Sequence, residues 1–240
     1  GTQEVNFSGD IAGTPGVTIN NTATVVYSGS SKTYSGTTTI NTGTKLRISS
    51  NQTLGNIALN GGTLQIDTGV KLTVIGTYSS TGGTIDNKGT IKLAGGSVTF
   101  PGNATVNNGT ANTLTSIEVA SSATLILSSS FNVEGIFTVS SGGILEFNEF
   151  DILGSGKFTL ATTGTIKITS VDGVNADGNS TGNIQCAGSR TFSQTGYYHY
   201  VGSSTPQFTG TAMTSGSTAV YFDGTTTITT NTWHHFAATV

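Results

Sequence analysis

The chain has 240 residues, of which 34% are apolar and only 9% are charged, and its formal net charge is −3. Low charge combined with alternating apolar residues argues against disorder, which high charge and low hydrophobicity favour. The balance offers no basic surface for nucleic acid, and no apolar run approaches the roughly eighteen residues of a membrane-spanning helix.

Residues 1–60 form a threonine-rich beginning that contains short strand patterns. The start, Gly1-Thr2-Gln3-Glu4, has neither the basic nor the apolar segment of a signal peptide. Apolar side chains then alternate with polar ones over short runs, the period of two that a strand with one buried face shows. The expected strand cores are Val17–Ile19, Thr37–Thr42, Leu46–Ile48 and Ile57–Leu59.

One short unit repeats through residues 61–170: a glycine, a small or polar residue, and then apolar, polar and apolar residues. It occurs twice between Gly61 and Val74. Gly, Asn, Thr and Ser separate the copies, and Gly and Asn tolerate the positive φ angles of tight turns. Further strand cores are Thr90–Leu93, Ser97–Phe100, Ala104–Val106, Ile117–Val119, Leu145–Phe147, Phe150–Ile152, Phe158–Leu160 and Ile166–Ile168.

The spacing of these cores, roughly six to fifteen residues, fits either a solenoid with two or three short strands per coil or a large β-sandwich or barrel. The recurrence of one unit, as if stacked copies shared one environment, favours the solenoid. No helical period of apolar residues is present. We therefore predict an all-β fold: a right-handed parallel β-helix (β-solenoid) with short strands and Gly/Asn/Thr-rich turns, a rod on the order of 50 to 60 Å long.

The composition changes near residue 170, where a loop from Asp172 to Ser180 interrupts the repeat. We predict a regular β-solenoid over residues 1–170, and a continuing solenoid with longer loops and an aromatic cluster over residues 171–240. Terminal caps, which shield the end edges of a solenoid, are not evident in the sequence. The chain is therefore expected to be a segment of a longer protein.

Within the second region, Asn183–Cys186 alternates like a strand, so the single cysteine, Cys186, is expected to be a small buried side chain. The aromatic cluster Tyr197–Tyr200 follows. Alternation predicts that Tyr197 and His199 face one side and that Tyr198 and Tyr200 face the other.

Four short motifs resemble a block found in very large secreted proteins of the Bacteroidetes group. They are Gly-Asn-Ile-Gln at 182–185, Ser-Arg-Thr-Phe at 189–192, Tyr-x-Tyr-x-Gly at 198–202 and Gln-x-Thr-Gly at 207–210. Those proteins are β-helical, adhesin-like surface proteins that are often exported by type IX secretion. The resemblance, over residues 164–210, implies an extracellular or cell-surface setting, a structural or adhesive role and no catalytic residues, although the sorting domain of that family is not seen.

Enzymes that cut polysaccharides on a parallel β-helix need carboxylates on both sides of one bond. The only close acidic group is Glu146, Glu149 and Asp151. Alternation places Glu146 and Asp151 on outward faces of neighbouring strands, which is typical of a solvated wall. We expect no enzymatic activity.

The loop also contains Asn175-x-Asp177-Gly178, a pattern similar to part of a calcium loop. The first ligand position would fall on Gly173 and no closing glutamate follows, so we interpret it as a turn-rich connection. Of the three histidines, His234 and His235 are adjacent and would point to opposite faces of a strand, whereas a metal site needs converging ligands. We expect neither a metal nor a cofactor.

Two binding functions remain open beside the structural one. Tyr197, His199 and Trp233 are candidate glycan contacts; the stretch Trp233–Ala237 resembles a Trp-His-His strand of glycan-binding jelly rolls. Ice binding is suggested by the threonine runs Thr37–Thr39 and Thr225–Thr230, but the outward positions between them are mixed in type and sign. We predict a structural or adhesive segment that forms fibres by self-association, with cell-surface glycans as the alternative partner.

Overall fold

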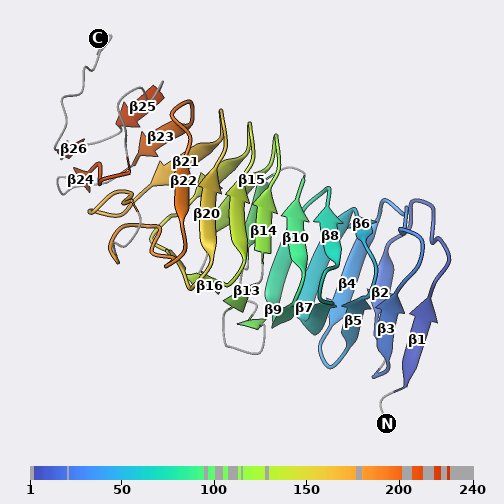
Figure 1. Cartoon of the computed structure of the whole chain (residues 1–240). Coiled ribbons are helices and arrows are strands. Elements are labelled where there is room, and N and C mark those ends of the chain that lie inside the picture. The colour runs from blue at the N-terminus through green and yellow to red at the C-terminus, as the bar shows by residue number, and fades with distance from the viewer. Residues whose placement is uncertain are drawn as a thin grey trace.

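The chain forms a stack of short parallel strands in a computed structural model. The model describes residues 3–20, 22–94, 97–100, 105–107, 113–114, 116–127, 130–176, 180–201, 207–212, 219–222 and 226–227. All the helical or strand structure in these ranges is strand, and every strand pairing is parallel. Figure 1 shows the stack running from β1 at one end to β25 and β26 at the other.

The strands belong to five sheets. The first sheet contains β1 (Glu4–Phe7), β2 (Val17–Ile19), β3 (Thr24–Tyr27), β4 (Thr37–Asn41), β5 (Lys45–Ile48), β7 (Asn56–Ile66), β9 (Tyr78–Asn87) and β12 (Thr105–Asn107). The second contains β6 (Gln52–Leu54), β8 (Lys71–Val74), β10 (Thr90–Leu93), β14 (Ser116–Val119), β17 (Ile136–Val139), β20 (Lys157–Leu160) and β22 (Arg190–Phe192). The third contains β11 (Ser97–Phe100), β15 (Thr124–Leu127), β18 (Ile144–Glu146), β21 (Thr165–Ile168), β23 (Tyr197–Tyr200) and β25 (Ala219–Phe222).

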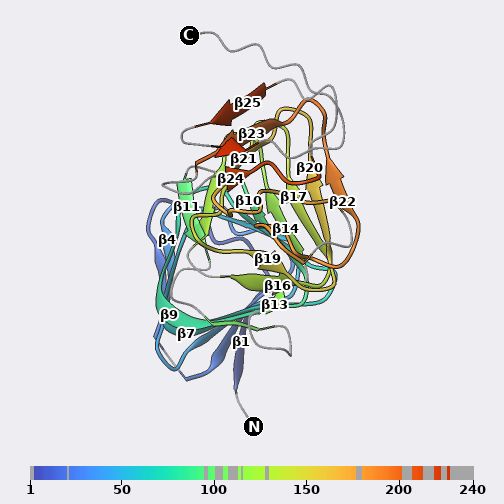
Figure 2. The ribbon, with the colours of Figure 1, turned by 90° about the vertical axis from the view of Figure 1, so that its left-hand side faces the viewer.

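The two remaining sheets are small. The fourth contains β13 (Thr113–Leu114), β16 (Phe131–Val133) and β19 (Ile152–Leu153), and the fifth contains β24 (Gln207–Phe208) and β26 (Thr226–Thr227). Viewed from the end that carries β23 and β25, the sheets surround a common interior (Figure 2). The predicted all-β parallel β-solenoid is therefore confirmed, and the sandwich alternative is wrong because parallel strands stack coil upon coil.

Side chains at equivalent positions of successive coils form columns. In the first sheet Val25 pairs with Leu46, which pairs with Leu64, so partners lie about 20 residues apart. All three are buried. Because each coil donates and accepts backbone hydrogen bonds with the coils on both sides, a buried column requires an apolar residue at the same place in every coil. This requirement explains the repeated apolar, polar, apolar unit.

Aromatic side chains fill the interior beneath the second sheet. The ring centroids of Phe137 and Phe158 lie 5.7 Å apart, and those of Phe158 and Phe192 lie 5.6 Å apart. Phe131, from the fourth sheet, packs on Phe137 with a centroid distance of 6.2 Å. Stacked aromatic pairs add to the stabilisation that burial alone provides. The column thus joins coils that are far apart in the sequence.

Paired glycines mark the corner where the long strands β7 and β9 bend. Gly61 and Gly83 have φ angles of +85° and +108°, which disfavour any other residue. A Cβ on Gly83 would lie 2.4 Å from the backbone oxygen of Gly62 in the neighbouring coil, and a Cβ on Gly62 would lie 2.6 Å from that of Asn41. The Gly-Gly corner is therefore fixed by contact between coils as well as by turn geometry.

A second corner, between the second and third sheets, is built from turns that bond to one another. The N–H of Ser122 donates to the carbonyl of Gly142 at 3.1 Å, Gly142 donates to Thr163 at 3.2 Å, and Thr163 donates to Thr195 at 2.9 Å. Three of these residues have positive φ angles: Ser122, Gly142 and Thr163. The backbone hydrogen bonds between successive coils therefore continue through the turns as well as through the strands.

The stack is irregular in two places, of which the sequence predicted only the loop after residue 170. The repeat expected to be regular over residues 61–170 is interrupted between β10 and β14, where the step from Ile91 to Ile117 exceeds the usual one and the first sheet ends at β12. The step from Phe158 to Arg190 is longer still, because it contains the loop after residue 170. Parallel pairing continues beyond this loop through β22 and β23.

Two predicted strand cores were also placed wrongly. Phe150 lies in a turn, donating its N–H to the carbonyl of Phe147 at 3.0 Å, and β19 begins at Ile152. The predicted strand Asn183–Cys186 is reduced to a single bridge, between Ile152 and Ile184. Burial does not alternate strictly in either segment: Phe150 and Asp151 are both half-buried, and Asn183 and Ile184 are both buried.

The Gly83→Ala variant tests the corner contact. The new Cβ would meet a backbone oxygen in a φ region that alanine avoids, so the free energy of unfolding should fall by about 1–3 kcal/mol. Gly9→Ala is the matched control, because nothing lies within 4 Å of its added Cβ. Chemical denaturation of both variants makes the comparison, and equal stability would contradict the proposed coil contact.

Candidate functional site

The aromatic cluster lies on β23 with the alternation that the sequence predicted. Tyr197 and His199 face outward and are half-buried, whereas Tyr198 and Tyr200 are buried in the interior. The hydroxyl of Tyr198 donates to the carbonyl of Ser193, and that of Tyr200 donates to the carbonyl of Thr209, both at 2.8 Å. Two aromatic side chains are therefore structural, and two lie on the outer surface. Trp233, the third candidate, lies outside the described residues.

The outward pair on β23 adjoins an ion pair in the same sheet. Tyr197 lies beside Thr165 and His199 beside Lys167. The ammonium group of Lys167 lies 2.6 Å from the carboxylate of Glu146 in the next coil. The outer face of the third sheet thus presents aromatic, hydroxyl and charged groups on adjacent coils.

The acidic group weighed as a catalytic candidate is divided among different partners. Glu146 is paired with Lys167, and Glu149 is exposed. Asp151 accepts hydrogen bonds from Asn183 at 3.4 Å and from Gln185 at 3.2 Å. Burial raises the pKa of Asp151, and the bond from Asn183 partly opposes that shift. Each of the two half-buried carboxylates is therefore engaged in holding neighbouring coils together.

The loop after residue 170 is fastened by the side chain of Asn175. Its amide nitrogen donates to the carbonyl of Thr181 at 3.1 Å, and its amide oxygen accepts the N–H of Thr211 at 3.0 Å. Asn175 is buried, so its amide fastens the loop and is not exposed as a ligand for an ion. Asp177 and Gly178 lie outside the described residues. Among the residues that are described, no three His, Cys, Asp or Glu side chains are grouped closely enough to hold a metal ion.

Buried polar side chains bond to backbone groups where this loop interrupts the hydrogen bonds between coils, and the first of them is Arg190. Arg190 donates to the carbonyl of Cys186 at 3.0 Å and to those of Asn175 and Ala176 at 3.2 Å. Unpaired buried carbonyls are costly, so a guanidinium that bonds several at once stabilises an irregular segment. Cys186 itself is buried, as the sequence predicted.

Two amide side chains, those of Gln207 and Asn183, likewise bond to backbone groups on either side of the loop. Gln207 donates from its amide nitrogen to the carbonyls of Ile168 and Ser170, each at 2.9 Å. The amide oxygen of Asn183 accepts the N–H groups of Thr169 and Ser170 at 2.9 and 2.8 Å. Gln207 and Asn183, like Arg190, belong to the motifs that resemble the Bacteroidetes block. Their contacts show that these residues shape the scaffold.

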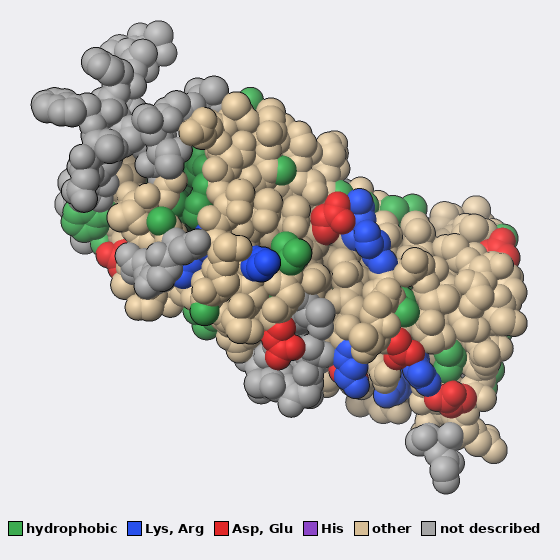
Figure 3. All heavy atoms as spheres, viewed as in Figure 1, with side chains coloured by type: hydrophobic (Ala, Val, Ile, Leu, Met, Phe, Trp, Pro, Cys, Tyr) green, Lys and Arg blue, Asp and Glu red, His purple; other side chains and the backbone are tan. Residues whose placement is uncertain are grey.

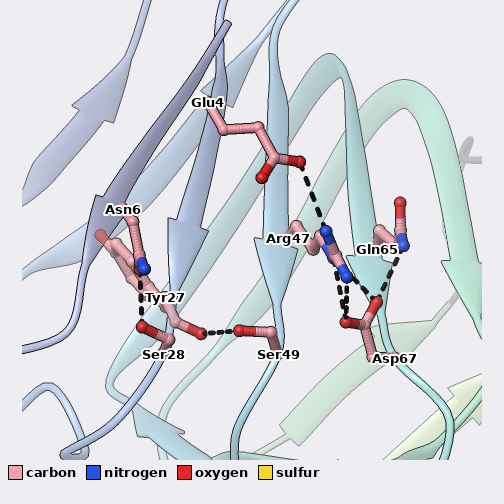
Figure 4. Close-up of polar contacts among 8 residues, drawn as sticks. All are labelled: Glu4, Asn6, Tyr27, Ser28, Arg47, Ser49, Gln65 and Asp67. Atoms are coloured by element: carbon pink, nitrogen blue, oxygen red, sulfur yellow. Dashed lines mark hydrogen bonds and ion pairs between the residues drawn. The ribbon is translucent and has the colours of Figure 1, made fainter. Parts of the chain in front are cut away.

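Polar contacts also connect coils on the outer face near the other end (Figure 4). The guanidinium of Arg47 lies 3.3 Å from Glu4 and 2.9 Å from Asp67. Burial alone would raise the pKa of Asp67, but hydrogen bonds from Arg47 and Gln65 hold it below its usual value. Figure 3 shows that charged side chains are few on this face and that both signs lie together.

Lys32, near this end, is buried, and the sequence does not predict it. The ammonium group of Lys32 donates to the carbonyls of Ser28 and Ser30 at 2.9 and 2.6 Å, and lies 5.7 Å from the ring centre of Tyr27. Burial lowers its pKa, while the charge of Asp10 opposes the shift. Its neighbours in sequence are serines and a threonine, so no local signal distinguishes it from an exposed lysine.

The threonine segments do not form a continuous array in the described part of the chain. Thr37 and Thr39 face outward on β4, but their partners on β7 are Asn56 and Ala58. Of the second run, only Thr226–Thr227 is described, as β26. Thr39 pairs with Thr18 on β2, so the row of threonines continues to one neighbouring coil but is interrupted at β7.

Comparison with protein-family models, with curated proteins and with solved structures finds no match to this chain. No helix with the length and apolar character needed to cross a membrane occurs among the described residues.

Buried tyrosines make stability dependent on pH in the alkaline range. Burial raises the pKa of Tyr27, Tyr78, Tyr198 and Tyr200 above the ordinary value of about 10. Above that pH the unfolded chain loses protons that the folded chain keeps, so the free energy of unfolding should fall as the pH rises.

The Tyr200→Phe variant isolates one of these groups. Above about pH 11 its stability should decline less steeply than that of the parent, by about 1.4 kcal/mol per pH unit, because one ionising group is gone. Below pH 9 it should be less stable by about 1 kcal/mol, since the bond to Thr209 is lost. Urea denaturation from pH 8 to 12 measures both effects. Equal slopes for the two proteins would refute the assignment.

Proposed function

We propose that this chain is a stiff structural or adhesive segment of an extracellular bacterial cell-surface protein, without catalytic activity of its own. The observation that carries the proposal is the parallel ladder, which runs through seven strands of the second sheet from β6 to β22. Bending such a stack would break backbone hydrogen bonds and separate buried columns, so the fold resists bending. The cell-surface setting rests on the sequence resemblance described above.

The surface suits a spacer rather than a binding cleft. Charged residues form only 9% of the chain, and several of those on the described coils pair across neighbouring coils: Arg47 with Asp67, Lys92 with Glu118 and Lys167 with Glu146. Exposed pairs of this kind contribute little stability individually. Their arrangement instead leaves a surface of mostly neutral hydrogen-bonding groups.

Small-angle X-ray scattering of a dilute sample tests the rod. A stack of coils with a rise of about 4.8 Å should give an elongated distance distribution with a maximum on the order of 50 to 60 Å. The length should not change between low and high salt, because backbone bonds and burial maintain the stack. A compact, near-spherical distribution, or a profile typical of a flexible chain, would contradict the proposal.

Glycan binding is the second candidate, favoured by the outward positions of Tyr197 and His199. Residues two apart on one face of a strand lie about 7 Å from each other, so the two side chains form one outward-facing surface. Aromatic side chains supply flat apolar surfaces for sugar rings, and the adjacent Lys167 and Glu146 supply hydrogen-bonding groups.

A glycan array with the parent chain and Tyr197→Ala tests this candidate. Loss of a ring that contacts sugar should reduce the signal of any bound glycan at least tenfold, as expected when a buried aromatic contact is removed. Thr159→Ala, a change at a half-buried outward position of the second sheet, is the control. Binding that is equal in both variants, or no binding by the parent, would remove the candidate.

A further inference from the structure

The outer face of the third sheet carries apolar side chains in its central coils. Each of the strands β15, β18, β21 and β23 has two outward positions, all half-buried, which hold Thr124 and Ile126, Ile144 and Glu146, Thr165 and Lys167, and Tyr197 and His199. The central outward row of the second sheet, from Thr53 to Thr191, holds only threonine, lysine and glutamate. The two isoleucines and the tyrosine therefore distinguish one face of the solenoid.

The apolar side chains on this face are never nearest neighbours. Ile144 pairs with Thr124 on one adjacent coil and with Thr165 on the other. Ile126 pairs with Glu146, and the tyrosine that begins β23 pairs with Thr165. The core of a protein–protein interface is a contiguous, mainly apolar patch. A surface on which apolar and hydrogen-bonding side chains interleave one by one instead suits a ligand that is amphipathic on the same scale.

A sugar chain has this character. Pyranose rings present C–H groups on their faces and hydroxyl groups around their edges. The ring of Tyr197 and the side chain of Ile144 can contact the C–H faces. The hydroxyl group of Thr165, which lies between them, can both donate a hydrogen bond to a sugar hydroxyl and accept one.

The charges on this face are already paired with each other. The ammonium group of Lys167 lies 2.6 Å from the carboxylate of Glu146 in the next coil. An ammonium group has three donors and a carboxylate has several acceptor sites, so the pair can still bond to hydroxyl groups. An acidic polymer that approached Lys167 would be repelled by Glu146. The surface therefore favours a neutral glycan.

The distribution of apolar residues over the strands sets the direction of the ligand. β15, β18 and β23 each contribute one apolar outward side chain, and β21 contributes none. A ligand aligned with one strand would therefore contact only one of them. Neighbouring strands lie about 4.8 Å apart, so the three steps from β15 to β23 span about 14 Å along the stack (Figure 1). Only a ligand that crosses the coils reaches all three side chains.

We propose that this face binds a neutral, linear polysaccharide that lies along the stack, across β15, β18, β21 and β23. Ile126 and Ile144 then contact the ligand in addition to Tyr197 and His199. The inference rests on the glycan candidate above, and it names the class of the ligand, its direction and two further contact residues.

The Ile144→Thr variant tests whether the ligand crosses the coils. Threonine occupies the paired position on both adjacent coils, so the substitution retains a residue suited to the strand and removes the apolar contact. The affinity should fall about three- to tenfold, since each methylene group removed from contact corresponds to a factor of about four. Ile136→Thr, the same change at an outward position of the second sheet that is 46% exposed, is the control and should bind as the parent does.

Isothermal titration calorimetry with neutral gluco-, manno- and xylo-oligosaccharides, from disaccharide to octasaccharide, measures the affinity. Within a series that binds, affinity should rise with chain length and then level off, because a longer chain reaches more coils. Polygalacturonate is the acidic comparator and should bind more weakly. Affinity that does not rise beyond the disaccharide, or tighter binding of polygalacturonate, would overturn the proposal.

The Tyr197→Ala variant in the same titrations separates this inference from the glycan candidate. Weaker binding by Tyr197→Ala, together with parental binding by Ile144→Thr, would leave a glycan site on β23 and refute a ligand that crosses the coils. A parent that binds none of the neutral oligosaccharides would remove both, while the rod is judged separately by scattering. Circular dichroism of each variant verifies that the β-structure is intact.

Discussion

Parallel register between successive coils is the constraint on which the structure depends. Each coil is bonded to both neighbours, so a side chain that points inward in one coil meets the equivalent side chain of the next, as Leu72, Ile91 and Ile117 do. A slip of one residue would turn a whole apolar column outward. The constraint extends to corners, where Gly62 and Gly83 lie too close to neighbouring backbone for a side chain, and to turns, where Ser122, Gly142 and Thr163 bond to one another.

Where the register is disturbed, polar side chains replace backbone partners. The loop after residue 170 interrupts the ladder, and the carbonyls and N–H groups that it leaves are bonded by Arg190, Gln207 and Asn183. Lys32 does the same for the turn at Ser28 and Ser30. These contacts lie at the two ends of the described stack, whereas the coils between them have an almost entirely apolar interior. The long loop after residue 170 is therefore accommodated because buried side chains donate hydrogen bonds to the carbonyls that it leaves without backbone partners.

Much of the fold could be predicted because it is encoded locally. Alternation at Leu64-Gln65-Ile66 identifies a strand, and its recurrence identifies a stack. Alternation also placed Tyr197 and His199 outward and Cys186 inward. The end of the first sheet at β12 could not be predicted from local alternation. The burial of Lys32 and Arg190 could not be predicted either, because it depends on which distant carbonyls lack partners. The residue type alone does not show whether the side chain of a lysine or arginine is solvated or buried. It also does not show whether Tyr197 and His199 contact a sugar, so glycan binding stays a prediction.

The most direct measurement of the central claim is native-state hydrogen exchange, resolved by residue. A stack held by bonds between neighbouring coils should protect the strands at its centre most, β14, β17 and β20 among them, and protection should fall progressively toward β1, the first strand of the described stack. Exchange at β1 should be the fastest among the strands of the first sheet. Uniform protection from β1 to β20, or rapid exchange throughout the central coils, would contradict the account, because neither fits a one-dimensional ladder whose stability comes from stacking.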